Sequence, residues 1–297
     1  MQRNTKQHPY ETLDVSLPSI IPFTKMEGAG NDYIYVEEFT ASLPHPEKMA
    51  VVLSDRHTGI GGDGLVLIGA SEKADFRMRI FNADGSEAEM CGNASRCVGK
   101  YVYEHGFTAR KDISLETGAG IRQLHLNASK GVVHTVRVDM GKPEMNPAAI
   151  PVNLVGDECL DVPLAVDGQT WCGTAVSMGN PHFVVPVPDV AALDLNTIGP
   201  LFENHALFPK RTNTEFIQIV SRNNILMRVW ERGSGETLAC GTGACAALVA
   251  CVLTGKTDRA ATVSLAGGDL YIEWDTSGTV FKTGPAREVF SGVYSPR

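Results

Sequence analysis

Cys91 and Cys240 are the residues of this chain whose type and setting best suit acid–base chemistry. They lie in FNADGSEAEMCGNASRC (81–97) and WERGSGETLACGTGAC (230–245), each directly before a glycine-rich turn into a predicted helix. A helix N-terminus stabilises a nearby anion through its free N–H groups and its dipole, which lowers the pKa of a thiol. We therefore predict that both thiols are reactive.

The same helix starts offer a site for a carboxylate. Free N–H groups at Gly92-Asn93 and at Gly241-Thr242 can hold a substrate carboxylate between two helix ends. One thiolate can then remove the α-proton while the other thiol protonates the opposite face, so the configuration inverts. The N–H groups would stabilise the charge that develops on the carboxylate. The pattern predicts an amino-acid epimerase that needs no pyridoxal phosphate, metal or nicotinamide.

Other interpretations of the cysteines are weaker. Cysteine is often buried, and Cys97, Cys245 and Cys251 on the apolar faces of the predicted helices fit a packing role. The spacings of Cys91 to Cys97 and of Cys240 to Cys245 do not form the close pairs of a zinc site. A thioredoxin-like redox pair would need Cys-x-x-Cys, which the chain lacks.

Short strands and two helices must position these thiols. The expected elements are strands near Tyr33–Glu37, Leu65–Ile68, Phe76–Phe81 and Val132–Asp139, and helices near Cys97–Glu104 and Ala244–Leu253. Gly106 and Gly255 follow the helices in the C-cap position. The glycine-rich DRHTGIGGDG (55–64) lacks the lysine of a phosphate-binding loop, and we interpret it as a turn-rich loop that shapes the pocket.

A repeat of 149 residues relates the two cysteine segments. It separates Cys91 from Cys240 (240 − 91), Glu87 from Glu236 (236 − 87) and Phe81 from Trp230 (230 − 81), and it carries Gly30-Asn31 onto Gly179-Asn180 without a gap. Agreement among several residue types favours a duplicated fold over chance matches of common turn residues. Two similar halves would each bring one cysteine to a shared cleft, because pockets favour domain interfaces.

Size and composition agree with two domains. The 297 residues exceed the usual size of a single core, and 43% of them are hydrophobic. The net charge of −8 argues against nucleic acid and anionic membranes as partners and favours a small-molecule substrate. Without an apolar span or a signal peptide, and with seven cysteines, we expect a cytoplasmic protein with reduced thiols. Residues 1–22 are expected to form an extension outside the fold.

Five blocks of the sequence resemble one enzyme family closely. They are MEGAGNDY (26–33), DRHTGIGGDG (55–64), RIFNADGSEAEMCGN (79–93), VSMGNPHF (176–183) and VWERGSGETLACGTGAC (229–245). In this order they resemble the diaminopimelate epimerases, which interconvert LL- and meso-diaminopimelate, over residues 23–290. The resemblance implies an α/β (α+β) fold of two pseudo-symmetric domains, each a barrel-like sheet around a central helix. The N-terminal domain would span 23–140, completed by 285–297, and the C-terminal domain 141–284.

The resemblance also implies the site residues. Cys91 and Cys240 would be the two catalytic bases, with the reacting carboxylate at Gly92-Asn93 and Gly241-Thr242. The other substrate-binding positions are Asn31, Asn82, Asn180, Asn213, Glu231 and Arg232. His182 and Glu231 match residues that tune the thiols. Because the distal end of diaminopimelate carries its own ammonium and carboxylate, Arg232 and the asparagines suit it. Neither a cofactor nor a metal is implied.

The chain departs from the family pattern at several positions. Glu27 stands where the family usually has His, and we expect it to add negative charge near the pocket mouth. Ala94-Ser95 replaces Gly-Ala in the helix start, which should be tolerated. Phe183 replaces a frequent cysteine and is expected to pack. Gly64 takes the place of a substrate-contacting Gln of some members and would contribute only backbone.

Two other functions stay open at this point. A racemase of another amino acid, such as histidine or proline, could use the same fold. Retention of Arg232 with Asn82 and Asn213 favours a substrate with a second amino-acid end. A non-catalytic metabolite-binding protein is the alternative from a different class, and the two helix-mouth cysteines argue against it. A homodimer is compatible with the sequence.

Overall fold

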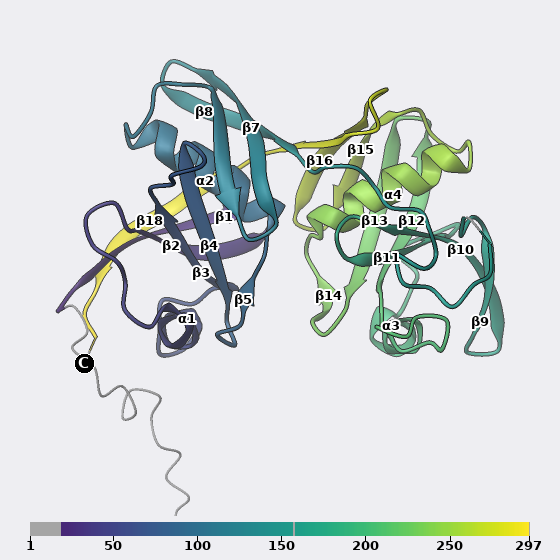
Figure 1. The fold of residues 1–297 in the computed structure, drawn as a ribbon. Coiled ribbons are helices and arrows are strands. Elements are labelled where there is room, and N and C mark those ends of the chain that lie inside the picture. The colour runs from purple at the N-terminus through teal and green to yellow at the C-terminus, as the bar shows by residue number, and fades with distance from the viewer. Residues whose placement is uncertain (1–18, 157, 297) are drawn as a thin grey trace, which may run out of the picture.

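The computed structural model describes residues 19–156 and 158–296, and in it two halves of similar shape stand side by side (Figure 1). The first half contains the helices α1 (Pro46–Ser54) and α2 (Gly92–Glu104) and the strands β1 (Ile21–Gly28), β2 (Asn31–Glu37), β3 (Gly64–Gly69), β4 (Phe76–Asn82), β5 (Glu87–Ala88), β6 (Asp112–Thr117), β7 (Gly120–Ser129), β8 (Val132–Asp139) and β18 (Arg287–Tyr294). The second half contains the helices α3 (Leu195–Glu203) and α4 (Gly241–Leu253) and the strands β9 (Val162–Val166), β10 (Gln169–Ser177), β11 (Pro181–Pro186), β12 (Asn213–Ser221), β13 (Asn224–Glu231), β14 (Gly235–Thr237), β15 (Ala260–Leu265), β16 (Gly268–Trp274) and β17 (Val280–Gly284).

The two halves pair their strands in the same way. In the first half the neighbours run β18, β1, β2, β3, β4, β6, β7 and β8, with β5 on β4. In the second half they run β9, β10, β11, β12, β13, β15, β16 and β17, with β14 on β13. Antiparallel pairing of β8 with β17 joins the halves into one sheet. The expected α/β (α+β) fold class is confirmed.

The register of the strands follows the 149-residue repeat. Tyr33 pairs with Gly64 in the parallel ladder of β2 and β3, and His182 pairs with Asn213 in that of β11 and β12. Both members of the second pair lie 149 positions after those of the first. Figure 1 places α2 and α4 at corresponding points of the two halves. The repeat therefore reflects matched backbone positions as well as matched residue types.

Each cysteine-bearing helix is enclosed by strands of its own half. α2 contacts β1, β2, β7 and β8, and α4 contacts β10, β11, β12, β15, β16 and β17. Enclosure explains why Gly243–Cys251 are all buried, since a helix surrounded by sheet needs no polar face. α1 and α3 pack on the outer faces, where α1 adds Met49 and Leu53 to a separate apolar cluster. Burial on all sides fixes the helix starts rigidly.

Tight turns fix the chain beside each site. Gly30 and Gly179 have φ of +82° and +96°, which glycine adopts without steric cost, at the turns that lead into β2 and β11. Asn31 and Asn180, directly after these glycines, are thereby held at matching places in the two halves. Gly106 and Gly255 also have positive φ after α2 and α4, as a C-cap requires.

The chain ends differ in part from the sequence-based expectation. β1 begins at Ile21, which is buried, so Ile21 and Pro22 belong to the fold and not to an extension of residues 1–22. The rest of that predicted extension, up to residue 18, lies outside the described residues. β18 pairs antiparallel with β1, so the C-terminal strand joins the first half. Within the described part of the chain, no helix is both long and apolar enough to cross a membrane.

Candidate active site

Cys91 and Cys240 occupy the N-cap positions of α2 and α4. Both have extended backbone, with φ and ψ of −137° and 116° at Cys91 and −112° and 109° at Cys240. The helices therefore begin at Gly92 and Gly241, earlier than the apolar stretches alone predicted. Both thiols are free. Cys240 Sγ accepts a hydrogen bond from the backbone N–H of Gly243 at 3.4 Å, as an N-cap side chain does.

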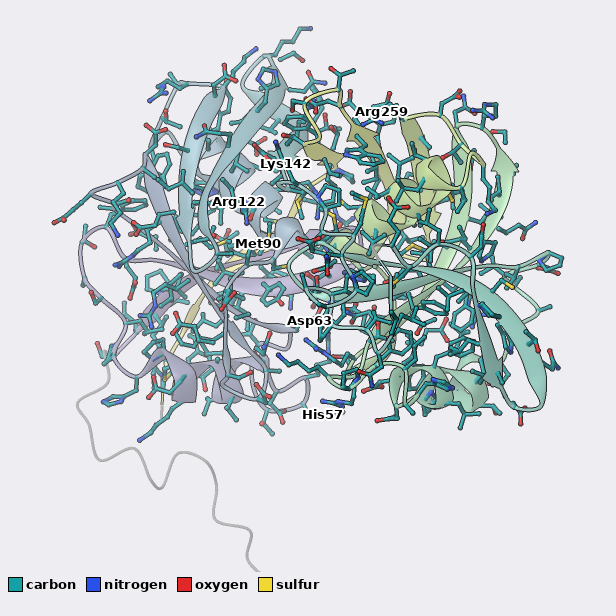
Figure 2. All side chains as sticks on the ribbon, turned by 45° about the vertical axis from the view of Figure 1, so that its right-hand side comes forward. His57, Asp63, Met90, Arg122, Lys142 and Arg259 are labelled. Atoms are coloured by element: carbon teal, nitrogen blue, oxygen red, sulfur yellow. The ribbon has the colours of Figure 1, made fainter. Side chains whose placement is uncertain are left out.

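The two thiols line a single cavity of about 460 Å³ between the halves. Most of the predicted site residues line it with them: Asn31, Asn82, Gly92, Asn93, Asn180, Glu231, Arg232, Gly241 and Thr242. A larger cleft of about 1360 Å³ shares Asn31, Asn82 and Glu231 with the cavity. Figure 2 labels Met90 and Arg122, which line the cavity, and Asp63, which lines the cleft, along the seam between the halves.

Asn213 and His182 do not line the cavity but support residues that do. Asn213 is buried, its Oδ1 accepts a hydrogen bond from the backbone N–H of Arg232 at 2.9 Å, and its Nδ2 donates to Pro181 O at 2.7 Å. His182 is fully buried and its Nε2 lies 3.0 Å from Oδ1 of Asn180. These two predicted residues thus position cavity-lining groups.

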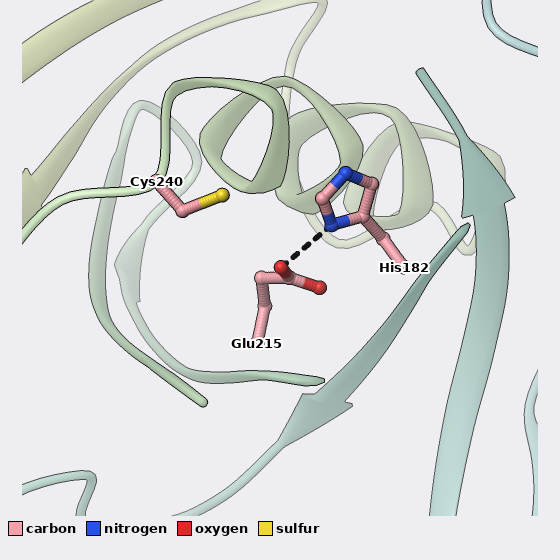
Figure 3. A group of neighbouring side chains, drawn as sticks. All are labelled: His182, Glu215 and Cys240. Atoms are coloured by element: carbon pink, nitrogen blue, oxygen red, sulfur yellow. Dashed lines mark hydrogen bonds and ion pairs between the residues drawn. The ribbon is translucent and has the colours of Figure 1, made fainter. Parts of the chain in front are cut away.

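A buried dyad lies beside Cys240. His182 Nδ1 and Glu215 Oε1 are 2.7 Å apart, and neither side chain is exposed (Figure 3). The other carboxylate oxygen of Glu215 has no hydrogen-bond partner among the described residues. Glu215 was not among the site residues predicted from the sequence. The 149-residue repeat carries a signal for it, since the matching position in the first half is the apolar, buried Val66. In the second half, Glu215 therefore stands where the first half has a core residue.

The dyad and Cys240 could also hold a metal ion. One potential ligand atom from each of His182, Glu215 and Cys240 lies within 4.8 Å of the others. Zinc would need nitrogen, oxygen and sulfur ligands at about 2.0–2.3 Å around one centre. In this structure His182 Nδ1 and Glu215 Oε1 bond directly to each other, so one potential ligand atom of each residue already has a partner. The arrangement therefore fits a carboxylate–imidazole pair beside a thiol.

The electrostatics around Cys240 differ from the sequence-based expectation. Burial raises the pKa of the Cys240 thiol well above its ordinary value, and the charges of Glu231 and Glu215 raise it further. The lowered pKa predicted for Cys240 from its helix N-terminus is therefore wrong. Glu231, whose Oε1 accepts a hydrogen bond from Thr237 Oγ1, is half-buried, and the desolvation of its carboxyl raises its pKa. Cys240 is held as a neutral thiol.

The surroundings of Cys91 are less buried and carry amides. Its Sγ lies 3.5 Å from Asn31 Oδ1, and Asn31 Nδ2 donates to Asp63 Oδ2 at 2.6 Å. Asp63 belongs to the glycine-rich loop and pairs with Arg56 at 2.9 Å. Arg56 and Asp63 both line the larger cleft, so the loop shapes that cleft and does not line the cavity of the two thiols. Figure 2 shows His57 of the same loop below Asp63.

The positions that depart from the family pattern do not line the cavity. Glu27 pairs with Arg287 at 3.0 Å and accepts a hydrogen bond from the N–H of Gly30, and it lines neither the cavity nor the cleft. The negative charge expected at the pocket mouth is therefore neutralised at the junction of β1 and β18. Phe183 is fully buried in the outer core of the second half, as expected. Ser95 Oγ donates to Cys91 O at 2.9 Å within the helix start.

Sequence comparison decides the family. The family model described as diaminopimelate epimerase matches residues 23–146 and 174–289. The chain belongs to the diaminopimelate epimerase family. A diaminopimelate epimerase of Agathobacter rectalis is 57% identical over 278 residues, covering 91% of this chain and 98% of that protein. One of Methanococcus maripaludis is 52% identical over 271 residues, with 91% and 98% coverage. This family member is therefore an isomerase of the epimerase type.

Solved structures support the fold of this family member. A phenazine biosynthesis protein of the PhzF family from Bacillus anthracis aligns with a TM-score of 0.67 at 17% identity, covering 93% of this chain and 99% of that one. A hydroxyproline epimerase from Agrobacterium vitis aligns with a TM-score of 0.66 at 13% identity, covering 94% and 92%. At such low identity the likeness establishes the fold alone.

Proposed function

We propose that this chain interconverts LL- and meso-diaminopimelate by a two-base mechanism at Cys91 and Cys240, without a cofactor. The observation that carries the proposal is the placement of two free thiols at two helix N-caps on one cavity. Inversion at a carbon needs an acid on one face and a base on the other, and two thiols suffice for both. The names of the close relatives supply the substrate.

The reacting carboxylate would bind between the two helix starts. Gly92, Asn93, Gly241 and Thr242 line the cavity in the first turns of α2 and α4, where backbone N–H groups lack helical partners. These N–H groups would stabilise the negative charge that spreads onto the carboxylate as the α-proton leaves. The α-carbon is then held between the thiols without a metal or pyridoxal phosphate.

The two thiols would enter the reaction in different protonation states. Cys240, whose pKa is raised by burial and by the carboxylates of Glu231 and Glu215, would donate a proton to the carbanion. Cys91 would act as the base that removes the α-proton from the other face. After one turnover the proton has moved from one thiol to the other, so the reverse reaction begins with the roles exchanged. The His182–Glu215 pair would tune Cys240.

The distal end of the substrate would lie against Arg232 and the asparagines. Asn213 fixes the backbone of Arg232, and Arg232 Nη1 donates to Lys210 O at 3.0 Å, which leaves its other N–H groups for a carboxylate. Asn31, Asn82 and Asn180 line the same cavity and would sense the distal stereocentre. The enzyme would work in the cytoplasm, where thiols stay reduced, and a homodimer stays a prediction.

The relatives disfavour the alternative of a racemase for another amino acid, because those at 52% to 57% identity are named for diaminopimelate. The test is a racemisation assay with LL-, meso- and DD-diaminopimelate, L-lysine and L-histidine. We expect turnover of LL- and meso-diaminopimelate alone. Arg232→Lys should lower turnover of LL-diaminopimelate roughly thirtyfold or more, since lysine cannot form the forked contact. Equal turnover of L-lysine or L-histidine would contradict the substrate assignment.

A further inference from the structure

Lys282 is a buried lysine that lies behind the active site. It lies on β17, which joins the two halves through β8, and its side chain is completely buried. Its Nζ has no hydrogen-bond partner among the described residues. Burial, together with the nearby Arg96, lowers the pKa of Lys282 to about 8. A methionine would fill the same space without this desolvation cost, so packing alone does not account for a lysine here.

Two glycines leave room for the ammonium group. A methyl group at Gly92 or at Gly241 would overlap Nζ of Lys282, and Cε of the lysine would lie 2.9 Å and 3.3 Å from those methyl positions. Gly92 and Gly241 are the first residues of α2 and α4 and line the cavity, whereas Lys282 does not line it. The ammonium group therefore lies against both helix starts, on the side away from the cavity.

The charged groups that face Lys282 come from both central helices. They are the guanidinium of Arg96 on α2 and the thiols of Cys91, Cys240 and Cys245. Arg96 is also fully buried, and its Nη2 likewise has no hydrogen-bond partner in the described part of the chain. Neither cation forms an ion pair with a carboxylate of the described residues. Two cations thus lie behind the site, and an anion in the site would be their counter-charge.

We propose that Lys282 is a positioning residue that places positive potential behind both thiols and behind the bound carboxylate. The proposal rests on the proposed function of the same site. The lysine touches neither thiol nor substrate but acts through space across the two glycines. Positive potential stabilises a thiolate and the charge that spreads onto the carboxylate. Because the ammonium contacts both helix starts, one charge serves both directions of the reaction.

The test compares Lys282→Met with wild type by the rate at which iodoacetamide alkylates Cys91 and Cys240 across pH 6 to 10. Mass spectrometry of the full-length protein resolves the two sites. Loss of the buried cation that lies against both helix starts should make each thiol harder to deprotonate, which slows alkylation at pH 7 about tenfold or more. The variant should melt at or above the wild-type temperature, because a desolvated charge has been removed.

Lys100→Met is the matched control. Lys100 is a nearly buried lysine at the other end of α2 and pairs with Glu104 at 2.6 Å. This change should lower the melting temperature and leave alkylation of both thiols unchanged. If Cys91 and Cys240 of the Lys282→Met variant are alkylated at the wild-type rate, the proposal is overturned. Alkylation needs no substrate, so failure of diaminopimelate turnover would contradict the proposed function separately.

Wild-type protein provides a second readout that does not depend on any variant folding. As Lys282 loses its proton near pH 8, its support for the thiolates disappears. The alkylation rate should then rise less steeply with pH above 8 than below it. A profile that follows a single titration for each thiol, without a break near pH 8, would also overturn the role of Lys282.

Discussion

Cys91 and Cys240 occupy the same place in two halves of one pattern, yet the charges around them differ. The strand register, the N-cap position and the start of the following helix are 149 positions apart throughout. At four matched positions near the thiols the side chains differ in kind. The second half has His182, Glu215, Glu231 and Arg232 where the first half has Tyr33, Val66, Asn82 and Ala83.

This difference separates two requirements of an epimerase. Matched backbones place one thiol on each face of a carbon, which suits inversion in either direction. The substrate itself is not symmetric, because its distal end lies on one side only. In the second half the carboxylates of Glu231 and Glu215 keep Cys240 protonated, and Arg232, which lines the same cavity, would bind the distal end under the proposed function. Under the proposed function, the duplicated backbone would place the two thiols, and the residues that differ between the halves would recognise the substrate.

The largest expected effect is that the two halves are equally indispensable. Cys91→Ala and Cys240→Ala should each lower epimerisation by about a thousandfold or more, because inversion fails when either face lacks its acid or base. Ser at either position should do little better. Cys97→Ala, a buried thiol in the same helix as Cys91, is the control and should stay active. Substantial turnover by either single Ala variant would contradict the equal requirement for both thiols.

Glu215→Gln should affect one half only. The charge of Glu215 contributes to the raised pKa of Cys240, so its removal should shift the pH midpoint of Cys240 alkylation downward and leave that of Cys91 in place. Epimerisation should fall about tenfold, since Cys240 then holds its proton less firmly. Glu236→Gln, a surface carboxylate of the same half, serves as control. If the pH midpoints of alkylation of Cys91 and Cys240 shift together, the effect of Glu215 is not local to Cys240.

The smallest expected effect concerns a pair of matched ion pairs. Arg79 Nε lies 2.8 Å from Glu87, and Arg228 Nε lies 2.7 Å from Glu236, 149 positions later. Both are partly exposed, so Glu87→Gln and Glu236→Gln should each lower the free energy of unfolding by less than about 1 kcal/mol. Chemical denaturation measures both. If the changes in unfolding free energy caused by Glu87→Gln and Glu236→Gln differ by more than about 1 kcal/mol, the two matched ion pairs share their geometry but not their contribution to stability.

The sequence predicted the backbone of the site better than its charges. Residue types at the repeat located both thiols, and short apolar runs located β2, β3, β4 and β8 within one or two residues. The starts of α2 and α4 were predicted too late, because Gly92 and Gly241 interrupt the apolar pattern. Glycines, small polar residues and buried helix ends carry little periodic signal.

Buried charges account for most of what the sequence did not predict. Glu215 and Lys282 lie in the strand segments TEFIQIV and VFKTG, each between a threonine and a phenylalanine. Sequence alone does not say which face of such a strand is buried. The pKa of Cys240 depends on Glu231 and Glu215, which the fold brings from other strands. The sequence predicted that Cys240 lies at a helix N-terminus, but it did not predict the burial that dominates the pKa of Cys240.

The central claim, that two thiols act on opposite faces of one carbon, is tested most directly by turnover of LL-diaminopimelate in deuterium oxide. Mass spectrometry and NMR at low conversion measure deuterium at the inverted carbon of meso-diaminopimelate. Because Cys91 and Cys240 exchange their protons with solvent and the donor differs from the acceptor, nearly every product molecule should carry one deuterium there. Product that retains the original α-hydrogen would indicate a single base and contradict the two-thiol account.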